Sequence, residues 1–431
     1  MAKVDASAPG MGPLLRAYLI GVKVAQPVLP AYLRRRLRQG REDPTRWREK
    51  LGEAGLPRPE GRLVWMHAVG LGEVMALRGL IAAMAQKRPD LSFLVTSSAR
   101  SSAQVFALNM PLRTRHQFLA LDAPGPVARF LDHWQPDLSI WAEQDLWPGL
   151  VVAAHARGIP LALINARMNA QAFAARMRYR GLFKNIYARF AHISAQDTET
   201  AINLRKLGAA PVEVTGSLKA GAGPLADTPE ARAVMAAAFR GRKTWCAASS
   251  HAADEAVALS AQQAIYAKDP SRLLVIAPRN PVRRDAIVSA CAAAGLPVAV
   301  RSTGALPAQS DAVYLADTFG EMGLWYRVCP VSLIGGGMGD IGGHNPWEAA
   351  HLGCAVIHGP NVVNFAPDYA ALHNADAATE ARGAVDLIAA LQDPALSGRA
   401  ARAKALTARG MTGMDTLCHT LLALLPQAQN G

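Results

Sequence analysis

From about residue 60 onward, short apolar runs alternate with alanine-rich stretches, and this alternation constrains the fold more than any other feature of the chain. The apolar runs have the length and continuous hydrophobicity of strands that are buried on both faces, and the stretches between them are long enough for helices. This pattern is typical of parallel sheets with helices on both faces. We therefore predict an α/β fold of the doubly wound, Rossmann-like kind. The expected strands include residues 63–67, 93–96, 138–141, 161–165, 273–277, 331–334 and 355–358.

The length of the chain favours two domains, because 431 residues exceed what one ordinary core organises. Residues 215–229 are rich in glycine and proline, interrupt the alternation near its midpoint and indicate a linker. We predict an N-terminal segment over 1–58, one domain over 59–222 and another over 223–431. The two domains would face each other across a cleft, and the final helical segment could pack on either.

The formal net charge of +13 implies acidic partners, which include phosphorylated ligands, anionic lipid and nucleic acid. Nucleic acid is the least favoured, because the chain has no recognised binding module and no interleaved aromatic and basic residues. The five cysteines are widely spaced and form no Cys-x-x-Cys pair. Their spacing predicts neither a disulfide framework nor a zinc site.

The N-terminal segment combines an apolar stretch, residues 14–33, with a cluster of arginines that follows it. Charged residues and two prolines interrupt the stretch, so a clean membrane-spanning helix is not expected. A basic collar beside an apolar segment is typical of a helix that lies in the surface of an anionic bilayer. We predict membrane association; the alternative is an amphipathic helix packed on its own domain. The arginines are Arg34, Arg35, Arg36, Arg38 and Arg41.

Glycines follow the expected strand 331–334 at 335–337 and again at 342–343, where ligands can approach bare backbone. Pro346 fits the first turn of a helix that continues to Leu352, and a glycine loop before a helix start is a candidate anion site. Elsewhere in the same half, Arg279 closes a strand and could grip a phosphate. Taken singly, each motif is equally well explained as an ordinary loop or helix end.

Four further charged residues lie after expected strands or in the linker in the first half of the chain. Glu73 begins a helix after a glycine turn and could act as a base, although a glutamate there also complements the helix dipole. Glu143 and Asp145 end a strand beside a tryptophan and could hold sugar hydroxyls or stabilise a base, although solvated loop acids are a slightly better explanation when the pair is taken alone. Lys219 in the linker could face a cleft, although an exposed lysine is unremarkable in itself.

Taken in order, these segments resemble the Kdo (3-deoxy-D-manno-octulosonate) transferase family over nearly the whole chain. The ordered set is more specific than any one of its members. It comprises residues 31–55, 73, 143–148, 165–167, 196, 215–219, 248–251, 278–279, 317–321, 342–348 and 364–365.

The resemblance implies a GT-B glycosyltransferase that binds its acceptor on the N-terminal domain and CMP-Kdo mainly on the C-terminal one. It implies that Glu73 is the general base and that Glu143 and Lys219 stabilise the transition state. The implied reaction is an inverting transfer of Kdo to a hydroxyl of the lipid A precursor, lipid IVA, at the cytoplasmic face of the bacterial inner membrane during lipopolysaccharide assembly. The implied CMP-binding residues are Pro278, Arg279, Phe319, Gly320, Glu321, Asn345, Pro346, Trp347 and Glu348.

No metal or other cofactor is expected, because arginine, lysine and helix N-termini can meet the charge of a departing nucleoside monophosphate. Four positions depart from the usual family pattern, and they leave acceptor choice and rate open: Asp145, Gly149, Asn280 and Gly337. Two alternatives stay open as well. One is a GT-B transferase that uses a UDP-sugar and a lipid-linked acceptor, and the other is a catalytically silent paralogue that binds lipid.

Overall fold

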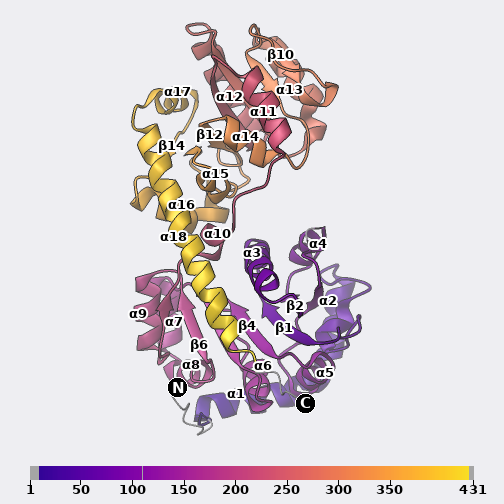
Figure 1. Ribbon diagram of the computed structural model, residues 1–431. Helices are drawn as coiled ribbons and strands as arrows, with labels where there is room; N and C mark the ends of the chain where they lie inside the picture. The colour runs from indigo at the N-terminus through magenta and orange to yellow at the C-terminus, as the bar shows by residue number, and fades with distance from the viewer. Residues whose placement is uncertain (1–8, 109, 427–431) are drawn as a thin grey trace. The chain divides into compact units, whose positions relative to one another are not determined.

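The computed structural model describes residues 9–108 and 110–426 (Figure 1). They form two compact units. The first unit contains the described residues up to Ala222 and those from Gly410 onward, and the second runs from Gly223 to Arg409. The chain from Gly410 onward packs with the first unit, which is one of the two placements that the sequence left open for the final helical segment.

The N-terminal segment is helical, and prolines set its breaks. Helix α1 (Pro13–Ala25), a single turn η1 (Gln26–Val28) and α2 (Leu29–Arg38) follow one another, and Pro27 and Pro30 lie in the first turns of η1 and α2. Another 3₁₀ turn, η2 (Trp47–Leu51), leads into the first sheet. Within the described residues, no helix has both the length and the apolar character needed to span a bilayer.

The first unit is built on one parallel sheet whose strand order is β3-β2-β1-β4-β5-β6-β7. Side chains alternate between its faces, so that Leu63 and Trp65 of β1 lie in one core while Val64 and Met66 lie in another. The strands are β1 (Arg62–His67), β2 (Leu91–Ser97), β3 (Thr114–Phe118), β4 (Leu138–Ala142), β5 (Leu161–Ala166), β6 (His192–Ala195) and β7 (Glu213–Val214).

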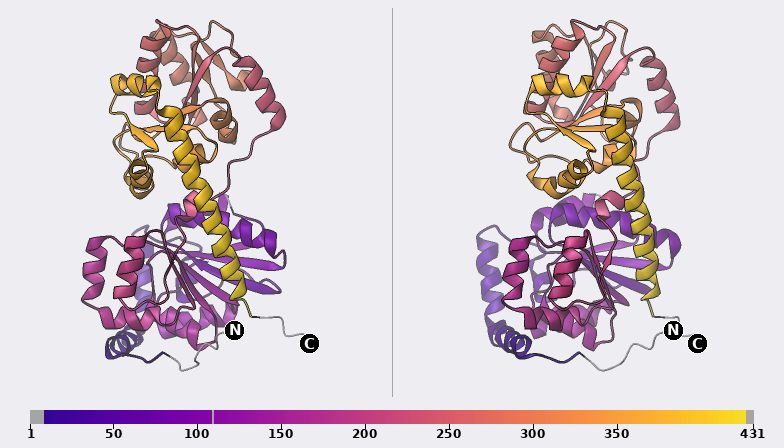
Figure 2. Two further views of the ribbon diagram at one scale, coloured as in Figure 1. Left: turned by 60° about the vertical axis from the view of Figure 1, so that its left-hand side comes forward. Right: turned by 90° about the vertical axis from the view of Figure 1, so that its left-hand side faces the viewer.

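Helices cover both faces of this sheet (Figure 2). The core around Trp65 is closed by α5 and α6, and the core around Met66 is closed by α3 and the end of the C-terminal helix. The helices are α3 (Leu71–Lys87), α4 (Arg100–Leu108), α5 (Pro124–Trp134), α6 (Pro148–Ala156), α7 (Ala170–Met177), α8 (Arg180–Tyr187), α9 (Thr198–Lys206) and the short α10 (Leu218–Gly221).

The second unit contains a parallel sheet of the same size, in the order β10-β11-β9-β8-β12-β13-β14. Its strands are β8 (Lys243–Ser250), β9 (Arg272–Pro278), β10 (Val298–Val300), β11 (Val313–Leu315), β12 (Val331–Ile334), β13 (Ala355–His358) and β14 (Ala378–Glu380). The helices are α11 (Pro229–Ala238), α12 (Ala252–Tyr266), α13 (Arg284–Ala293), α14 (Met322–Val328), α15 (Trp347–His351), α16 (Ala366–Asn374), α17 (Ala384–Gln392) and the first part of α18 (Leu396–Ala423), with 3₁₀ turns η3 (Pro281–Arg283), η4 (Arg301–Thr303) and η5 (Val363–Phe365).

Helix α18 contributes to the core of the first unit through its last turns. Met414, Leu417 and Leu421 lie in the same buried cluster as Leu77 of α3. Two glycines, Gly410 and Gly413, allow the helix to approach α10 and the residues before it closely. A β-carbon on Gly413 would lie 2.1 Å from the Thr215 carbonyl oxygen.

Candidate active site

Three non-glycine residues adopt a left-handed backbone at or just after the ends of central strands. They are Glu143 after β4 (φ 64°), Asn165 in β5 (φ 54°) and Ser249 in β8 (φ 53°). The β5 and β8 ladders shift register at the same places. Such strain persists only where the surroundings enforce it, and it clusters at functional sites. We therefore expect the catalytic and binding residues at the carboxyl ends of both sheets.

Glu73 lies in the first turn of α3, where it closes the helix start. Its Oε2 accepts hydrogen bonds from the backbone N–H groups of Gly70 (2.7 Å) and Val69 (3.2 Å). These bonds and the helix dipole hold the carboxylate in one place. Its other oxygen, Oε1, accepts no hydrogen bond from the described residues, so one face of the carboxylate can take a proton from a ligand.

Lys219 lies on α10, and its ammonium group lies beside the turn that carries Glu73. A β-carbon on Gly72 would be 3.6 Å from Lys219 Nζ. Asn165 sets the start of α10, because its Oδ1 accepts from the backbone N–H of Leu218 at 3.0 Å. Ser217 caps the same helix by accepting from Lys219 N at 3.3 Å. The structure thus brings two of the predicted site residues together.

The segment that carries Lys219 is also supported from behind by α18. Thr215 lies against Gly413, and a β-carbon on Gly410 would lie 2.7 Å from the backbone of Ala220. Backbone atoms on the other side leave no room for a side chain at either glycine. The position of the ammonium group therefore depends on a helix almost 200 residues further along the chain.

The block from Glu143 to Trp147 is fixed by a buried histidine. His67 Nε2 lies 3.1 Å from Asp145 Oδ2, and its Nδ1 lies 3.0 Å from Thr96 Oγ1. Trp147 Nε1 donates to the same Asp145 oxygen at 3.0 Å. Burial alone would raise the pKa of Asp145, but the hydrogen bond and electrostatic interaction with His67 and the hydrogen bond from Trp147 outweigh it and hold that pKa below its ordinary value. Asp145 is thus a charged anchor for the loop that begins at Glu143.

In the second unit, a single buried carboxylate holds the glycine loop that follows β12. Asp254 accepts from the backbone N–H groups of Gly336 (2.7 Å), Met338 (3.0 Å) and His251 (2.9 Å). The Gly336 carbonyl in turn accepts from the N–H groups of residues 342 and 343. Both glycine segments are thereby joined at Gly336 and tied to the start of α12.

A histidine pair lies at the mouth of this loop. His251 Nε2 and His344 Nε2 are 2.9 Å apart, and the rings are stacked. One nitrogen of such a contact must be an unprotonated acceptor. Burial, then the charges of His251 and Arg279, lower the pKa of His344 to about 4. The Arg279 guanidinium therefore lies near enough to His344 to influence it, although Arg279 itself is exposed.

The segment Asn345–Glu348 is braced internally. Asn345 Nδ2 donates to Glu348 Oε1 at 3.3 Å, and Asn345 Oδ1 accepts from Trp347 N at 3.1 Å. The helix expected to begin at Pro346 and reach Leu352 is shorter. Pro346 is its N-cap, and α15 ends at His351, because the backbone N–H of Leu352 turns back to the Ala349 carbonyl. Trp347 is buried, and its indole Nε1 donates to Asp368 Oδ1 at 2.8 Å, which ties the segment Asn345–Glu348 to α16.

The turn at 319–321 presents an aromatic ring next to a fixed carboxylate. Phe319 is 73% exposed, and Gly320 has a φ of 85°. Arg301 Nη2 donates to Glu321 Oε1 at 2.8 Å, and Thr318 donates to the same carboxylate. Burial would raise the pKa of Glu321, but these partners overcome it and lower that pKa. A bare ring of this kind is suited to stacking on a planar ligand.

Within residues 9–108 and 110–426, no cluster of three or more histidine, cysteine, aspartate or glutamate side chains has a geometry that could hold a metal ion. The charged groups at the two strand edges are instead arranged singly or in pairs. The chemistry they offer is proton transfer and electrostatic stabilisation.

Comparison with known proteins identifies the family. The family described as "3-Deoxy-D-manno-octulosonic-acid transferase (kdotransferase)" matches residues 45–222. The 3-deoxy-D-manno-octulosonic acid transferase of Bordetella pertussis is 34% identical over 352 residues, which are 78% of this chain and 81% of that protein. A probable mitochondrial 3-deoxy-D-manno-octulosonic acid transferase of Arabidopsis thaliana is 33% identical over 372 residues, 84% of this chain and 83% of that protein. The chain belongs to the Kdo transferase family.

Membership of the Kdo transferase family confirms the resemblance drawn from the sequence and the enzyme class that it implied. Among solved structures, the UDP-GlcNAc 2-epimerase of Neisseria meningitidis covers 84% of this chain and 99% of its own, with a TM-score of 0.51 and 15% identity. At that identity the likeness concerns the fold alone. It agrees with the predicted pair of parallel-sheet α/β domains of GT-B type.

The positions at which this Kdo transferase departs from the usual family pattern have local explanations. A β-carbon on Gly149 would lie 2.7 Å from Asp122 Oδ1, and one on Gly337 would lie 2.8 Å from Gly359 N. Asn280 accepts from Val282 N at 3.1 Å and so caps η3. Asp145 is long enough to reach His67. Each departure therefore fits the packing around it.

Three contributors to the site were not singled out from the sequence. Asp254 has a recognisable local signal, because an aspartate three residues after His251 has the spacing of a capping box. Arg301 has none, because its partner Glu321 is 20 residues away and the pairing depends on the sheet. Asn165 entered only as part of a family motif, and its bond to Leu218 connects segments 53 residues apart.

Proposed function

We propose that this protein transfers Kdo from CMP-Kdo to a hydroxyl group of the lipid A precursor, with inversion at the anomeric carbon. The proposal rests chiefly on one observation, the carboxylate of Glu73 with one oxygen open and the Lys219 ammonium next to its turn. Membership of the Kdo transferase family indicates which sugar is transferred. The positions of Glu73 and Lys219 at the ends of the strands suit a general base and a stabilising cation.

In this mechanism Glu73 is the general base. The acceptor hydroxyl loses its proton to Glu73 Oε1 as its oxygen bonds to the anomeric carbon, and the bond from that carbon to the CMP phosphate oxygen breaks. The two backbone donors on Oε2 fix the carboxylate so that no rotation is needed at the moment of transfer. A positioned base of this kind contributes about 10²- to 10⁴-fold to the rate.

Lys219 and Glu143 are proposed to stabilise the transition state. Lys219 is held by the Asn165 and Ser217 contacts and by the glycine packing of α18, so its charge is preorganised. An ammonium group suits the negative charge that develops on the sugar carboxylate or the leaving phosphate. Glu143 follows β4 in a strained conformation, and its loop is anchored through Asp145 and His67.

The second unit is proposed to bind CMP-Kdo at the carboxyl ends of its strands. Arg279, with Pro278 before it, would meet the phosphate. The glycine loop and Asn345–Glu348 would approach the ribose, where the Glu348 carboxylate can accept from hydroxyl groups. Phe319 to Glu321 would contact the base. No metal ion is required in this scheme, because arginine and backbone donors meet the phosphate charge.

We also propose that the N-terminal segment docks on the cytoplasmic surface of the inner membrane, close to a lipid acceptor. The outward face of α1 and η1 carries Ile20, Val24 and Val28, which are 63%, 73% and 62% exposed. The exposed arginines Arg34 and Arg35 follow on α2. Apolar side chains beside arginines match an interface of acyl chains and phosphates.

The direct test is incubation of the purified protein with intact CMP-Kdo and the tetra-acylated lipid A precursor, followed by mass spectrometry of the lipid. Addition of one or more Kdo masses supports the proposal and counts the sugars. An unmodified lipid, with the donor verified as intact, refutes it. Competition by free nucleotides separates the donors, because CMP should inhibit well below the concentration at which UMP does, and the reverse order would favour a UDP-sugar.

A further inference from the structure

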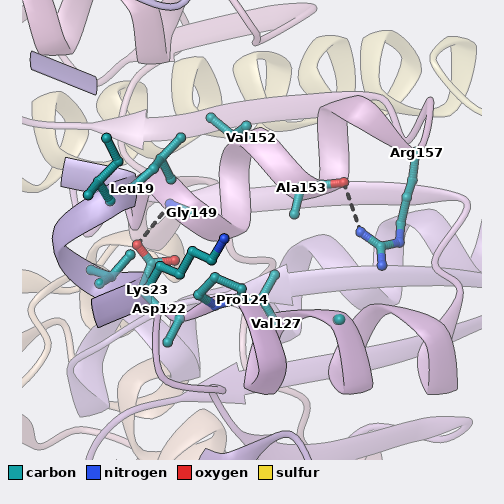
Figure 3. Close-up of a pocket in the computed structure, with 13 residues that line it drawn as sticks. Leu19, Lys23, Asp122, Pro124, Val127, Gly149, Val152, Ala153 and Arg157 are labelled. Carbon is teal, nitrogen blue, oxygen red and sulfur yellow. Dashed lines mark hydrogen bonds between the residues drawn. The ribbon is translucent and has the colours of Figure 1, made fainter. Parts of the chain in front are cut away.

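The first unit contains an apolar pocket under α1 that none of the proposed reaction steps uses (Figure 3). It has a volume of about 380 Å³ and lies between α1, α5 and α6. Leu19 and Val22 of α1, Val127 of α5, and Val152 and Ala153 of α6 form its walls. Ligand pockets commonly have volumes of about 300–1,000 Å³ and mostly apolar walls, so this pocket has the size and character of a ligand site.

The pocket has a defined structural frame rather than being a gap under a loose helix. Tyr18 of α1 donates to Asp122 at 2.8 Å, and the same carboxylate accepts from the backbone N–H groups of Gly149 (2.8 Å) and Leu150 (2.6 Å) at the start of α6. Gln26 accepts from Gly125 N at 2.7 Å at the start of α5. Hydrogen bonds from α1 and from the turn η1 thus fix this part of the chain to the N-termini of α5 and α6.

The mouth of the pocket is basic. Lys23 lines the pocket, and its side chain is exposed and makes no hydrogen bond or ion pair with another described residue. Arg157 lines the other end, where it pairs with Asp132 at 2.8 Å. A cation over an apolar pocket is complementary to an amphiphile with an anionic head.

The pocket is continuous with the proposed membrane-docking face, because Ile20 contributes to both. From the apolar walls, the unpaired Lys23 and this continuity, we propose that the pocket accepts one acyl chain of an anionic membrane phospholipid, with its phosphate at Lys23. The inference rests on the proposed membrane docking but not on the transfer reaction.

The test uses the full-length protein and vesicles of phosphatidylglycerol and phosphatidylcholine that contain a trace of phosphatidylglycerol with a photoreactive diazirine in one acyl chain. Flotation measures docking, and mass spectrometry of cross-linked peptides locates the chain. We expect labelling in α1, α5 and α6. Replacing Ala153 by phenylalanine fills the pocket, and Ala156→Phe is the matched control, because Ala156 is exposed on the same helix and does not line the pocket.

Ala153→Phe should reduce pocket labelling about tenfold, which corresponds to loss of roughly two buried methylene groups, while the protein still floats and Ala156→Phe labels normally. Lys23→Gln should lower labelling by anionic lipid about fivefold, the effect of one surface charge. Flotation of the parent protein without labelling of these helices overturns the pocket assignment and leaves docking intact. Failure to float overturns both. Labelling that occurs only with a diazirine-bearing lipid A precursor overturns the assignment to a phospholipid.

Discussion

Replacing Glu73 by glutamine separates the two roles that its position allows. A glutamate at the third position of a helix can be a capping residue alone, or a capping residue that is also a base. Glutamine retains a carbonyl oxygen that can accept from Gly70 N and Val69 N, so it preserves the cap, but it cannot take a proton from a hydroxyl group.

The magnitudes differ enough to decide between the roles. Loss of the negative charge removes the interaction with the helix dipole, about 0.3–1 kcal/mol, which lowers the melting temperature of a unit of this size by about 1–4 °C. Loss of the base should lower kcat by about 10²- to 10⁴-fold. Glu73→Ala loses the cap as well, at a cost of roughly 1–2 kcal/mol.

The assay is the initial rate of Kdo incorporation into the lipid, measured together with the melting temperature and with CMP affinity. The exposed Glu60 lies just before β1, and its side chain has no hydrogen-bond or ion-pair partner among the described residues, so Glu60→Gln is the matched control. We expect Glu73→Gln to lower the melting temperature by no more than about 4 °C and to leave CMP binding unchanged, while kcat falls by about 10²- to 10⁴-fold. Turnover within tenfold of the parent would show that the carboxylate only caps α3, and the base would have to be sought elsewhere.

Three further predictions test the support of the site. Gly413→Ala should destabilise the first unit by about 1–3 kcal/mol and lower turnover, because its β-carbon would lie 2.1 Å from the Thr215 carbonyl oxygen. Gly398→Ala on the same helix is the control and should be neutral or stabilising by up to about 1 kcal/mol. Equal urea midpoints for the two variants would contradict the packing argument. Lys219→Gln should lower kcat by about 10²-fold or more with little change in stability, and a rate that stays near the parent value would exclude Lys219 from the transition state. The pKa of His344 is about 4 in the folded protein, below its ordinary value, so its contribution to stability is complete above about pH 6.5 and is lost as the pH falls toward 4. In urea unfolding at several pH values, the free energy of unfolding of His344→Gln should therefore fall less steeply with decreasing pH than that of the parent, by up to about 1.4 kcal/mol per pH unit. Parallel slopes for the two proteins would refute this.

The sequence predicted the parts of the site that depend on local patterns. Strands β1, β4 and β12 are mostly apolar runs, so their ends, and with them the turns near Glu73, Glu143 and Gly335, could be located without a structure. The start of α3 was readable from its glycine turn and acidic first turn. Parallel strands bring their carboxyl ends to one edge, and this rule grouped the residues within each half of the chain.

What the sequence did not predict depends on contacts between distant segments. The alanine-rich stretch after residue 385 indicated a helix, but only packing shows that Met414 and Leu417 enter the first core. Gly410 and Gly413 lie in a helix, where glycine is unfavourable by about 1 kcal/mol relative to alanine, and nothing local indicates that they accommodate the backbone of residues 215–220. Asp254 likewise has a local capping pattern, while its bonds to Gly336 and Met338 span more than 80 residues.

Asn165 shows how strain and positioning are balanced at one residue. Its left-handed backbone is unfavourable for most side chains, by about 1–3 kcal/mol, but asparagine is among the residues that tolerate it best. Its side chain accepts from Leu218 N, a buried donor whose loss of a partner would cost about 1–3 kcal/mol. A glycine would relieve the strain but leave that donor unpaired. A larger residue without a matching acceptor would keep the strain and also leave the donor unpaired. The free energy that the hydrogen bond contributes is at least as large as the cost of the strain, so the strained conformation persists. The hydrogen bond forms only when α10 is in the position that places Lys219 next to the Glu73 turn. The backbone distortion at β5 and the position of the ammonium group are therefore one structural feature, and a substitution at Asn165 changes both.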